Sequence, residues 1–480
     1  MERVGKYEVR IDAVGDMRVP ATIYISEGMK MEKGAIEQLK NAAKLPGVVR
    51  ALATPDIHHG YGVPIGSVLG CSDIVVPAAV GYDINCGMRL HTTPFERHGF
   101  PAKELVQSIR RDIPLGEGRK NVSLDRTQFE AVLANGIRGL IEVAASPVQN
   151  HRVWDFFDPA EEKTTLERIE NAGSLAGEPG FMSGHAIGRG MDQLATLGGG
   201  NHFIEVQYVE TVYDEELAKK WGLELDRIVL MIHSGSRGLG HQVGGDNMKL
   251  AAQYNERRKD YRPSRDLAYF KREDSEARKY LGAMRAAANF AFANRALMSV
   301  LVKNSVRKLL GDAELPLLYD VPHNIAKEED HLGRSIVVHR KGATRAFGPK
   351  RMAGTPFDRT GQPVLIPGSM GTSSYVLVGV DENADSLASV NHGAGRVMSR
   401  TQAAGKRKGR KGKVIKEAAI SDHEFQQAMK GITLICEDPR SIKEEAPQAY
   451  KDIDAVIEAV TGGQLARTVA RMKPLAVLKG

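Results

Sequence analysis

The chain has 480 residues, of which 42% are hydrophobic and 26% charged, and its formal net charge is +7. A chain of this length and composition can bury a large core, which excludes a disordered tail or a fibre. It contains no apolar run of the roughly 18 residues that span a bilayer, and its first residues lack the apolar segment of a signal peptide. We therefore expect a soluble, cytoplasmic protein with no membrane partner. The positive charge favours a polyanionic partner.

The first 92 residues predict a helix between two groups of strands. Residues 1–31 suggest short strands, and MEKGAIEQLKNAAKL places apolar side chains at helical spacing over 32–44. Over 45–92, short apolar runs alternate with glycine and proline, which is typical of strands and tight turns. In this region the turn YDINC puts Asp83 and Cys86 three residues apart, close enough for both to face one ion.

The three cysteines are too few and too scattered for a disulfide framework. Cys71 and Cys436 have mostly apolar neighbours, so we expect both to be small buried hydrophobic residues. Cys86 lies among polar and glycine residues and is the candidate for chemistry.

Helices are predicted at 123–145 and 246–310. The second segment has the spacing of one long or two shorter amphipathic helices with basic residues on the polar side, and its apolar face is expected to form a buried layer. Residues 250–280 are dense in charge and are expected to form an exposed insertion.

Four histidines share one local setting, in which a short strand-like run ends in a turn rich in glycine, serine or asparagine. They are His202 in LGGGNHFIEV, His233 in IVLMIHSGSRGLG, His323 in LPLLYDVPHN and His392 in ASVNHGAGR. Rigid scaffolds place reactive groups on loops at strand ends. Together with Asp83 and Cys86, such imidazoles could bind zinc, manganese, iron or cobalt. Taken singly, each histidine could equally be a hydrogen-bonded core residue.

Three glycine turns, at 197–201, 367–371 and 393–395, could bring backbone N–H groups close to a phosphate, or could be turns only. None matches a Walker loop or a Rossmann fingerprint. In the third turn, His392 is a candidate nucleophile toward an activated phosphoryl group, with Arg396 or Arg400 offsetting negative charge. The alternative is that His392 binds a metal or supports its ligands.

Eight segments, in this order along the chain, resemble the RtcB family of RNA-splicing ligases: DIHHGYGVPIGSVLG, VGYDINCGMR, LGGGNHFIE, IHSGSRGLGHQ, DVPHN, RKGATRA, PGSMGTSSY and NHGAGR. The resemblance extends from about residue 45 to the last lysine. It implies an α+β fold, with mixed β-sheets flanked by helices in a single large domain over 1–480. Residues 246–300 are then a helical insertion relative to compact members.

The resemblance implies an enzyme that joins RNA ends carrying a 3′-phosphate or a 2′,3′-cyclic phosphate to 5′-hydroxyl ends, using GTP and two Mn²⁺ ions. His392 matches the histidine that takes GMP from GTP. The metal centre maps onto Asp83, Cys86, His202, His233 and His323, with Cys86 able to bridge both ions. The guanylate site maps onto Asn201, His202, Phe203, Ile204, Glu205, His323, Asn324, Pro367, Gly368, Ser369, Met370, Ser374, His392, Gly393, Ala394, Gly395, Tyr450 and Lys479.

Glu205 can accept hydrogen bonds from the N1–H and N2–H₂ groups of guanine, which adenine does not offer, so it would explain a preference for GTP. The basic segment GKRKGRKGK at 405–413 is a candidate guide for the RNA backbone, or a structural loop of the same charge. The candidate RNA contacts are Arg189, Arg237, Arg345, Lys406, Arg407, Lys408 and Arg410.

The implied reaction, in tRNA splicing or RNA repair, runs through a guanylylated His392 and an RNA 3′ end capped with GMP. Two alternatives remain: a paralogue that caps 3′-phosphate ends but joins them weakly, and a non-catalytic, metal-dependent RNA-binding protein. We expect a monomer, with archease as a further partner to consider.

Overall fold

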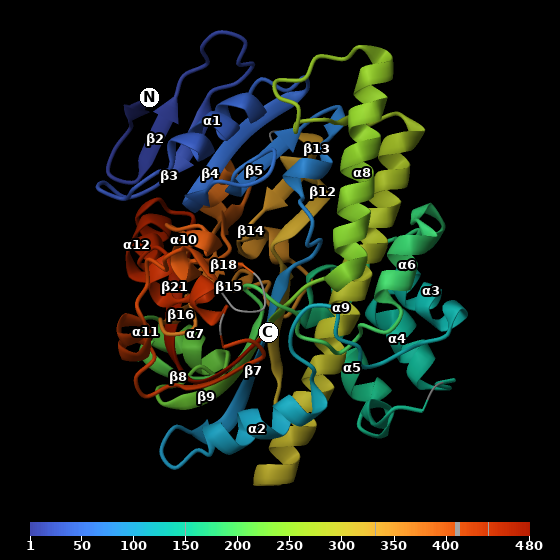
Figure 1. Cartoon of the computed structure of the whole chain (residues 1–480), viewed down its shortest axis with the longest axis vertical. Helices are drawn as coiled ribbons and strands as arrows, with labels where there is room; N and C mark the ends of the chain where they lie inside the picture. The colour runs from blue at the N-terminus through green and yellow to red at the C-terminus, as the bar shows by residue number, and fades with distance from the viewer. Residues whose placement is uncertain (149, 332, 409–412, 440) are drawn as a thin grey trace.

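The computed structural model describes the whole chain except residues 149, 332, 409–412 and 440 (Figure 1). The fold is α+β, as predicted. Its helices are α1 (Lys33–Ala42), α2 (Ala102–Asp112), α3 (Arg126–Asn135), α4 (Ile137–Ala144), α5 (Pro159–Thr165), α6 (Gly184–Gly190), α7 (Glu215–Lys220), α8 (Arg237–Arg258), α9 (Ser275–Leu310), α10 (Arg400–Ala404), α11 (Asp422–Ala428) and α12 (Ile453–Gly462).

Two large mixed sheets carry most of the strands. The first has the order β1 (Glu2–Arg3), β2 (Glu8–Ile11), β3 (Ala21–Tyr24), β4 (Val48–His58), β5 (Ile65–Cys71), β13 (Arg334–Lys341) and β12 (Asn324–His331). The second has the order β11 (Leu317–Pro322), β7 (Gly87–Glu96), β9 (Arg227–Ser234), β8 (Phe203–Val212), β21 (Ala466–Lys479), β16 (Ser374–Gly379) and β15 (Pro363–Ile366), with β20 (Thr433–Cys436) beside β21. Only the β3–β4 and β20–β21 pairs are parallel among the described strands.

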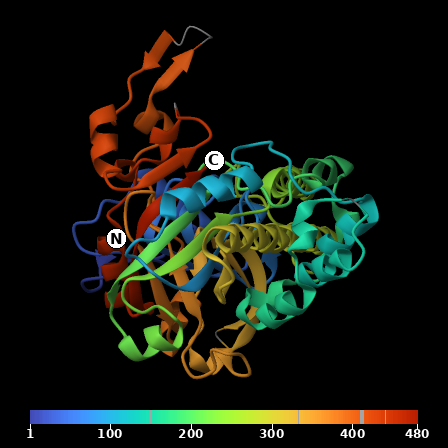
Figure 2. The same ribbon diagram turned by 90° about the horizontal axis from the view of Figure 1, so that it is seen from below.

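Three short strand pairs complete the sheets: β6 (Ile74–Val75) with β10 (Phe270–Lys271), β14 (Ala343–Arg345) with β17 (Ser389–Asn391), and β18 (Lys406–Lys408) with β19 (Lys413–Lys416). Strands β18 and β19 project from the body of the molecule (Figure 2). Among the described residues, no helix combines the length and the apolar character that a membrane span requires.

The predicted elements of the N-terminal region are confirmed. Helix α1 occupies the predicted helical segment, strands β4 to β7 fill 45–92, and α3 and α4 fill 123–145. The helical prediction over 246–310 is wrong in its middle, because α8 begins earlier and ends at a left-handed Lys259 (φ 56°), and α9 starts only at Ser275. Of the intervening residues, those from 267 to 270 are buried, so the predicted exposed insertion is only partly exposed. Whether 246–300 is an insertion relative to other members stays a prediction.

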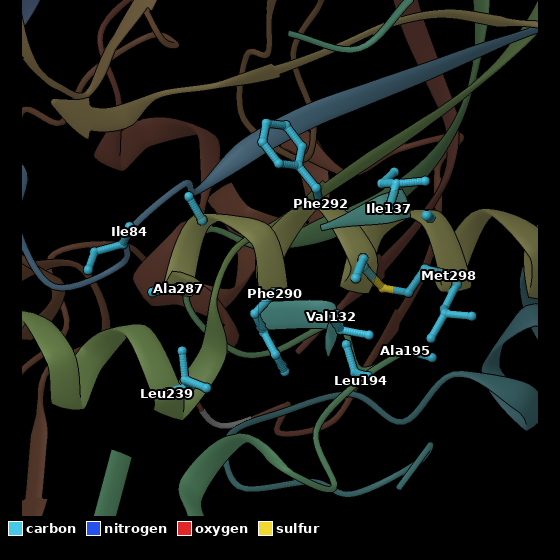
Figure 3. Packing of buried hydrophobic residues seen from close by; sticks show 14 of the residues in the cluster. Ile84, Val132, Ile137, Leu194, Ala195, Leu239, Ala287, Phe290, Phe292 and Met298 are labelled. Carbon is cyan, nitrogen blue, oxygen red and sulfur yellow. The ribbon is translucent and has the colours of Figure 1, made fainter. Parts of the chain in front are cut away.

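Helix α9 lies in the middle of the largest core, as expected for a buried helical layer. Phe290 of α9 packs in the same cluster as Leu239 of α8, Val132 of α3 and Ile84 (Figure 3). Each of these side chains is at most 1% exposed, and such burial stabilises a fold by about 1.5–3 kcal/mol per large apolar side chain. Because Ile84 belongs to this core, the turn that carries Asp83 and Cys86 is anchored to it.

Cys71 is fully buried, as predicted, whereas Cys436 on the short strand β20 is only half-buried. The prediction for Cys436 was therefore too strong, because apolar sequence neighbours do not reveal that β20 is a short strand paired with the last residues of β21.

Candidate metal and nucleotide site

The turn between β6 and β7 presents Asp83 and Cys86 to one side while Ile84 is held in the core. The Cys86 N–H donates to the Asp83 carbonyl (3.0 Å), which closes the turn, and Asn85 adopts a left-handed conformation (φ 52°). The Asn324 side chain donates to the same Asp83 carbonyl (2.9 Å). The sequence spacing therefore gives the geometry that was predicted for this turn.

Strands β8 and β9 bring two histidines to this turn. Cys86 Sγ lies 3.1 Å from His233 Nε2 and 3.5 Å from His202 Nε2. His202 Nε2 also lies 2.8 Å from an Asp83 carboxylate oxygen. One ligand atom each from Asp83, Cys86 and His202 falls within 4.8 Å of the others, which is close enough for a shared ion.

His323, which follows β11, completes the predicted set of metal ligands. Its ring centroid lies 5.6 Å from that of His233 and 5.6 Å from that of His392. It is fully buried, and neither ring nitrogen has a hydrogen-bond partner among the described residues; Nδ1 of His202 also lacks one. Buried polar atoms are normally satisfied, so the unpartnered His323 ring fits an ion bound at one of its nitrogens.

The protonation states fit the same reading. Burial lowers the pKa of His233 and His323 well below the usual value, so both are neutral and able to ligate. Burial, followed by the neighbouring Asp83, raises the pKa of the Cys86 thiol. A metal cation would offset that cost by stabilising the thiolate.

Arg295 of α9 links the loops that carry these ligands. Its guanidinium donates to the Asn85 carbonyl (2.9 Å), the Asn85 side-chain oxygen (3.0 Å) and the Ser234 carbonyl (2.9 Å). It also forms an ion pair with Asp320 of β11 (2.7 Å), and both side chains are completely buried. Sequence reasoning missed this residue, because an arginine inside a helical run gives no local sign of its partners.

His392 is held by a buried carboxylate. Its Nδ1 lies 2.6 Å from Asp56 Oδ2, and its backbone N–H donates to the same oxygen (3.3 Å). Burial alone would raise the pKa of Asp56, but the hydrogen bonds from His392 and Thr54 outweigh it and hold the pKa below its usual value. The ionised carboxylate can only accept, so Nδ1 donates and Nε2 keeps its lone pair.

Sequence reasoning also missed Asp56, although its motif, DIHHGYGV, was noted. Gly395 shows how closely the two loops approach: its φ is +76°, and a Cβ there would lie 2.2 Å from the Asp56 carbonyl oxygen. A glycine at position 395 is therefore required by this contact.

A cavity of about 220 Å³ lies beside His392 and is lined by most of the predicted guanylate residues. Those that line it are Asn201, Phe203, Pro367, Gly368, Ser369, Met370, His392, Gly393, Ala394, Gly395, Tyr450 and Lys479. The volume is below the roughly 300–1,000 Å³ usual for small-molecule sites, so a nucleotide would fit only if lining side chains moved.

Glu205 and Lys479 are brought together by the pairing of β8 with β21, which places Lys479 opposite Phe203 and Val477 opposite Glu205. Burial raises the pKa of Glu205 to about 7, although the Gln207 amide donates to it (2.6 Å). Burial also lowers the pKa of Lys479. Residues near a chain terminus are usually mobile, but Lys479 is held in place because it belongs to the long central strand β21.

The remaining predicted guanylate residues lie behind the cavity wall or in other surroundings. Ser374 accepts from Gln207 (3.0 Å), and Ile204 points into the main core. The amide of Asn324 spans Asp83 and the Gly342 N–H (2.7 Å), so it braces two loops. His202 lines a separate hollow, which is also lined by Asp83.

A cluster around Glu445 closes the far side of the nucleotide cavity. Glu445 is 5% exposed and forms ion pairs with Arg396 (3.4 Å) and Arg400 (3.3 Å), and Tyr450 donates to it. Lys479 lies 3.9 Å away. Arg396 and Arg400 were candidates from the sequence, but Glu445 was not.

The predicted RNA contacts divide into three groups. Arg189 and Arg237 line a groove of about 790 Å³ beside Asp83 and His202. Arg345 lies elsewhere, half-buried against Glu170 (3.3 Å) and the ring of Phe347, so the structure does not bring it to the groove.

The third group belongs to the basic segment. Lys406, Arg407 and Lys408 form β18, and Lys406 is exposed, whereas Arg410 lies outside the described residues.

Comparison with known proteins places this chain in a family. The family model described as tRNA-splicing ligase RtcB matches residues 38–480. A tRNA-splicing ligase RtcB of Thermococcus kodakarensis is 40% identical over 97% of this chain and 95% of its own length. An RNA-splicing ligase RtcB of Mycobacterium bovis is 41% identical over 92% of this chain and 100% of its own. The chain therefore belongs to the RtcB family of RNA ligases.

Proposed function

We propose that the protein joins RNA ends carrying a 3′-phosphate or a 2′,3′-cyclic phosphate to 5′-hydroxyl ends, with GTP and Mn²⁺, in tRNA splicing or RNA repair. The observation that carries this proposal is His392, oriented by the buried Asp56 where the nucleotide cavity meets the Asp83, Cys86 and histidine cluster. A nucleophilic imidazole in that position suits nucleotidyl transfer.

In the first step, His392 Nε2 attacks the α-phosphorus of GTP, a P–N bond forms, and the P–O bond to pyrophosphate breaks. Asp56 accepts a hydrogen bond from Nδ1 and stabilises the positive charge that develops on the ring. Glu205 and Lys479 would hold the guanine base, since a carboxylate accepts from N1–H and N2–H₂ and an ammonium donates to O6.

In the second step, an oxygen of the RNA 3′-phosphate attacks the phosphorus on His392 and the P–N bond breaks, which gives a 3′ end capped with GMP. A cyclic phosphate is first opened by water. In the third step, the 5′-hydroxyl attacks the RNA phosphate, GMP leaves, and a 3′,5′-phosphodiester forms.

The residues that would hold two Mn²⁺ ions are Asp83, Cys86, His202, His233 and His323, with the Cys86 thiolate as the soft ligand among them. When bound there, the ions would supply positive charge to the phosphoryl oxygens and help to deprotonate the attacking group. The soft thiolate and imidazoles suit several transition metals, and the carboxylate extends the range to manganese.

The two cavities suggest where the RNA ends lie. The nucleotide cavity and the groove share Asn201 and Arg400, and candidate metal ligands line both, His233 in the cavity and Asp83 and His202 in the groove. Because the attacking and leaving oxygens of a phosphoryl transfer lie roughly in line, a 5′-hydroxyl strand would enter from the groove, opposite the departing GMP. Arg189 and Arg237 would then contact its backbone. Lys406, Arg407 and Lys408 remain candidates for wider RNA contacts.

A cytoplasmic location, a monomeric state and assistance by archease are further parts of this proposal. Assistance by archease rests on the family resemblance alone.

The experiment is an end-joining assay with one RNA ending in a labelled 3′-phosphate and one starting with a 5′-hydroxyl, in the presence of GTP and Mn²⁺. The proposal expects a joined product in which the labelled phosphate resists phosphatase and links the two strands. Accumulation of a GMP-capped 3′ end without joining would favour the capping paralogue. RNA binding with neither product would favour the non-catalytic RNA-binding protein.

A further inference from the structure

The groove beside the metal ligands continues into a second hollow. The first part, of about 790 Å³, and the second, of about 460 Å³, are both lined by Tyr82, Arg189 and His241. The second part lies beyond these residues and is bounded by Tyr61, Lys249 and the loop after α8. One continuous surface therefore leads from the metal ligands to a more distant part of the molecule.

One face of α8 forms the wall of this surface. Arg237, His241, Gly245 and Lys249 recur every four residues, so they lie in a row along the helix. Gly244 packs against the turn that holds Tyr82, because a Cβ there would lie 2.8 Å from a backbone oxygen and 3.2 Å from the Cα of Tyr82. The small residues thus let that turn lie directly against the helix.

Two aromatic rings line the junction of the two hollows, and a third lies beside them in the second hollow. The rings of Tyr82 and His241 are stacked, with centroids 4.8 Å apart and planes inclined by 20°. Tyr61 follows, with its centroid 5.9 Å from that of Tyr82. Tyr61 is 41% exposed and Tyr82 is 37% exposed, although rings of this size gain by burial. An exposed row of this kind offers faces on which nucleic-acid bases can stack.

The second hollow is also positively charged. Four cationic side chains, Arg189, Lys249, Arg262 and Arg265, line it against two carboxylates, Glu256 and Asp266. One of these carboxylates is engaged by Arg262 (3.4 Å). Exposed cations beside exposed rings are the combination that single-strand-binding proteins use for backbone and bases.

We propose that Tyr61, Tyr82 and His241 form a stacking platform for the bases of the 5′-hydroxyl RNA strand, several nucleotides from its reacting end. This inference rests on the proposed function, since it extends the strand that Arg189 and Arg237 would guide. Arg189 lies at the boundary, so the backbone can pass from the first hollow into the second. The stacking is blind to base identity, because every base has a face that can stack on a ring.

The test measures the KM of end joining for 5′-hydroxyl strands of increasing length, with a fixed 3′-phosphate strand. For the unaltered protein, KM should fall by about tenfold between a strand of about two nucleotides and one of about eight. In His241→Ala and Tyr61→Ala, most of this dependence on length should disappear, whereas Tyr61→Phe keeps a ring and should retain it. Tyr213→Ala, which removes an exposed tyrosine far along the second sheet, is the matched control and should behave like the unaltered protein.

The outcomes separate the two proposals. If the unaltered protein joins no ends at all, the proposed function fails. If it joins ends but KM does not depend on the length of the 5′-hydroxyl strand, or depends on it equally in Tyr61→Ala and His241→Ala, the platform is refuted while the function stands. A length dependence that belongs to the 3′-phosphate strand and is lost in these variants would refute the assignment of the strand.

Discussion

Asp56 controls which nitrogen of His392 is free to react. Its ionised carboxylate accepts from Nδ1 and leaves the lone pair on Nε2, and Thr54 donates to its second oxygen (2.6 Å). An asparagine has nearly the same shape but cannot stabilise the imidazolium. An Asp56→Asn variant therefore tests the effect of the carboxylate while His392 itself is kept.

We predict that Asp56→Asn slows the guanylylation of His392 by about 10³-fold or more, since loss of the carboxylate in an equivalent acid–histidine pair has an effect of this size. The measurement is the single-turnover rate of protein labelling by GTP. Asp385→Asn, which alters an exposed carboxylate paired with Arg50, is the control and should label at the normal rate. An Asp56→Asn rate within about threefold of normal would show that the carboxylate does not assist the reaction.

Glu205 should make GTP binding depend on pH. Its pKa is raised by burial to about 7, so below that pH the carboxyl group is largely protonated, and one of its oxygens becomes a donor that clashes with a guanine N–H. Because its pKa in the folded state exceeds that in the unfolded state, its contribution to stability is present at low pH and falls as the pH rises through about 7.

We predict that the KM for GTP rises as the pH falls below about 7, and that Glu205→Gln raises it about 10- to 100-fold and removes this dependence. Steady-state guanylylation, measured at pH values from about 5.5 to about 8.5, would show both effects. A Glu205→Gln variant with an unchanged KM for GTP would remove Glu205 from guanine recognition.

Helix α9 connects several elements of the site, because its residue Arg295 contacts three segments that carry candidate metal ligands. Arg295 contacts the turn of Cys86, the end of β9 beside His233, and Asp320 on the strand that leads to His323. These segments are far apart in the sequence, so the sheet order and α9 together assemble the site. Loss of a group that supports metal ligands typically weakens metal binding 10- to 100-fold.

We predict that Arg295→Lys lowers the affinity for Mn²⁺ by about 10- to 100-fold and lowers the free energy of unfolding by about 3 kcal/mol. The reason is that a lysine cannot donate to the Asn85, Ser234 and Asp320 oxygens at once. Metal titration and chemical denaturation, each with and without a chelator, measure the two effects. Arg307→Lys, on the exposed end of the same helix, should change neither. Full Mn²⁺ affinity in a destabilised Arg295→Lys variant would assign the residue to folding alone.

In the whole molecule, the net charge of +7 matters for RNA binding because of where the cationic side chains lie. Arg189 and Arg237 lie on the groove, Lys249 and Arg265 lie farther along it, and the strands β18 and β19 project from the body (Figure 2). We predict that RNA affinity falls steeply with salt, with a log–log slope of about −0.7 per neutralised phosphate. Arg189→Ala should make this slope shallower by about one phosphate contact, and a slope unchanged by it would exclude Arg189 from the backbone path.

The sequence allowed the turn of Asp83 and Cys86 and the loops of the four histidines to be predicted, because each depends on short spacing between strand and turn. The partners that cross the fold could not be predicted in the same way. Asp56 reaches His392 across 336 residues, and Arg295 reaches Asn85 across 210, so neither contact leaves a local pattern. The sequence left open whether 246–310 holds one long helix or two shorter ones, because charged residues in 259–274 continue the composition of a polar helical face.

The most direct test of the central claim is covalent labelling with GTP that carries the label on its α-phosphate, in the presence of Mn²⁺, for the unaltered protein and for His392→Ala. The account predicts a label that survives denaturation, is stable in alkali, is released by acid, and is absent from His392→Ala. No label on an unaltered protein that has bound Mn²⁺, or a label of equal strength on His392→Ala, would contradict nucleotidyl transfer through His392.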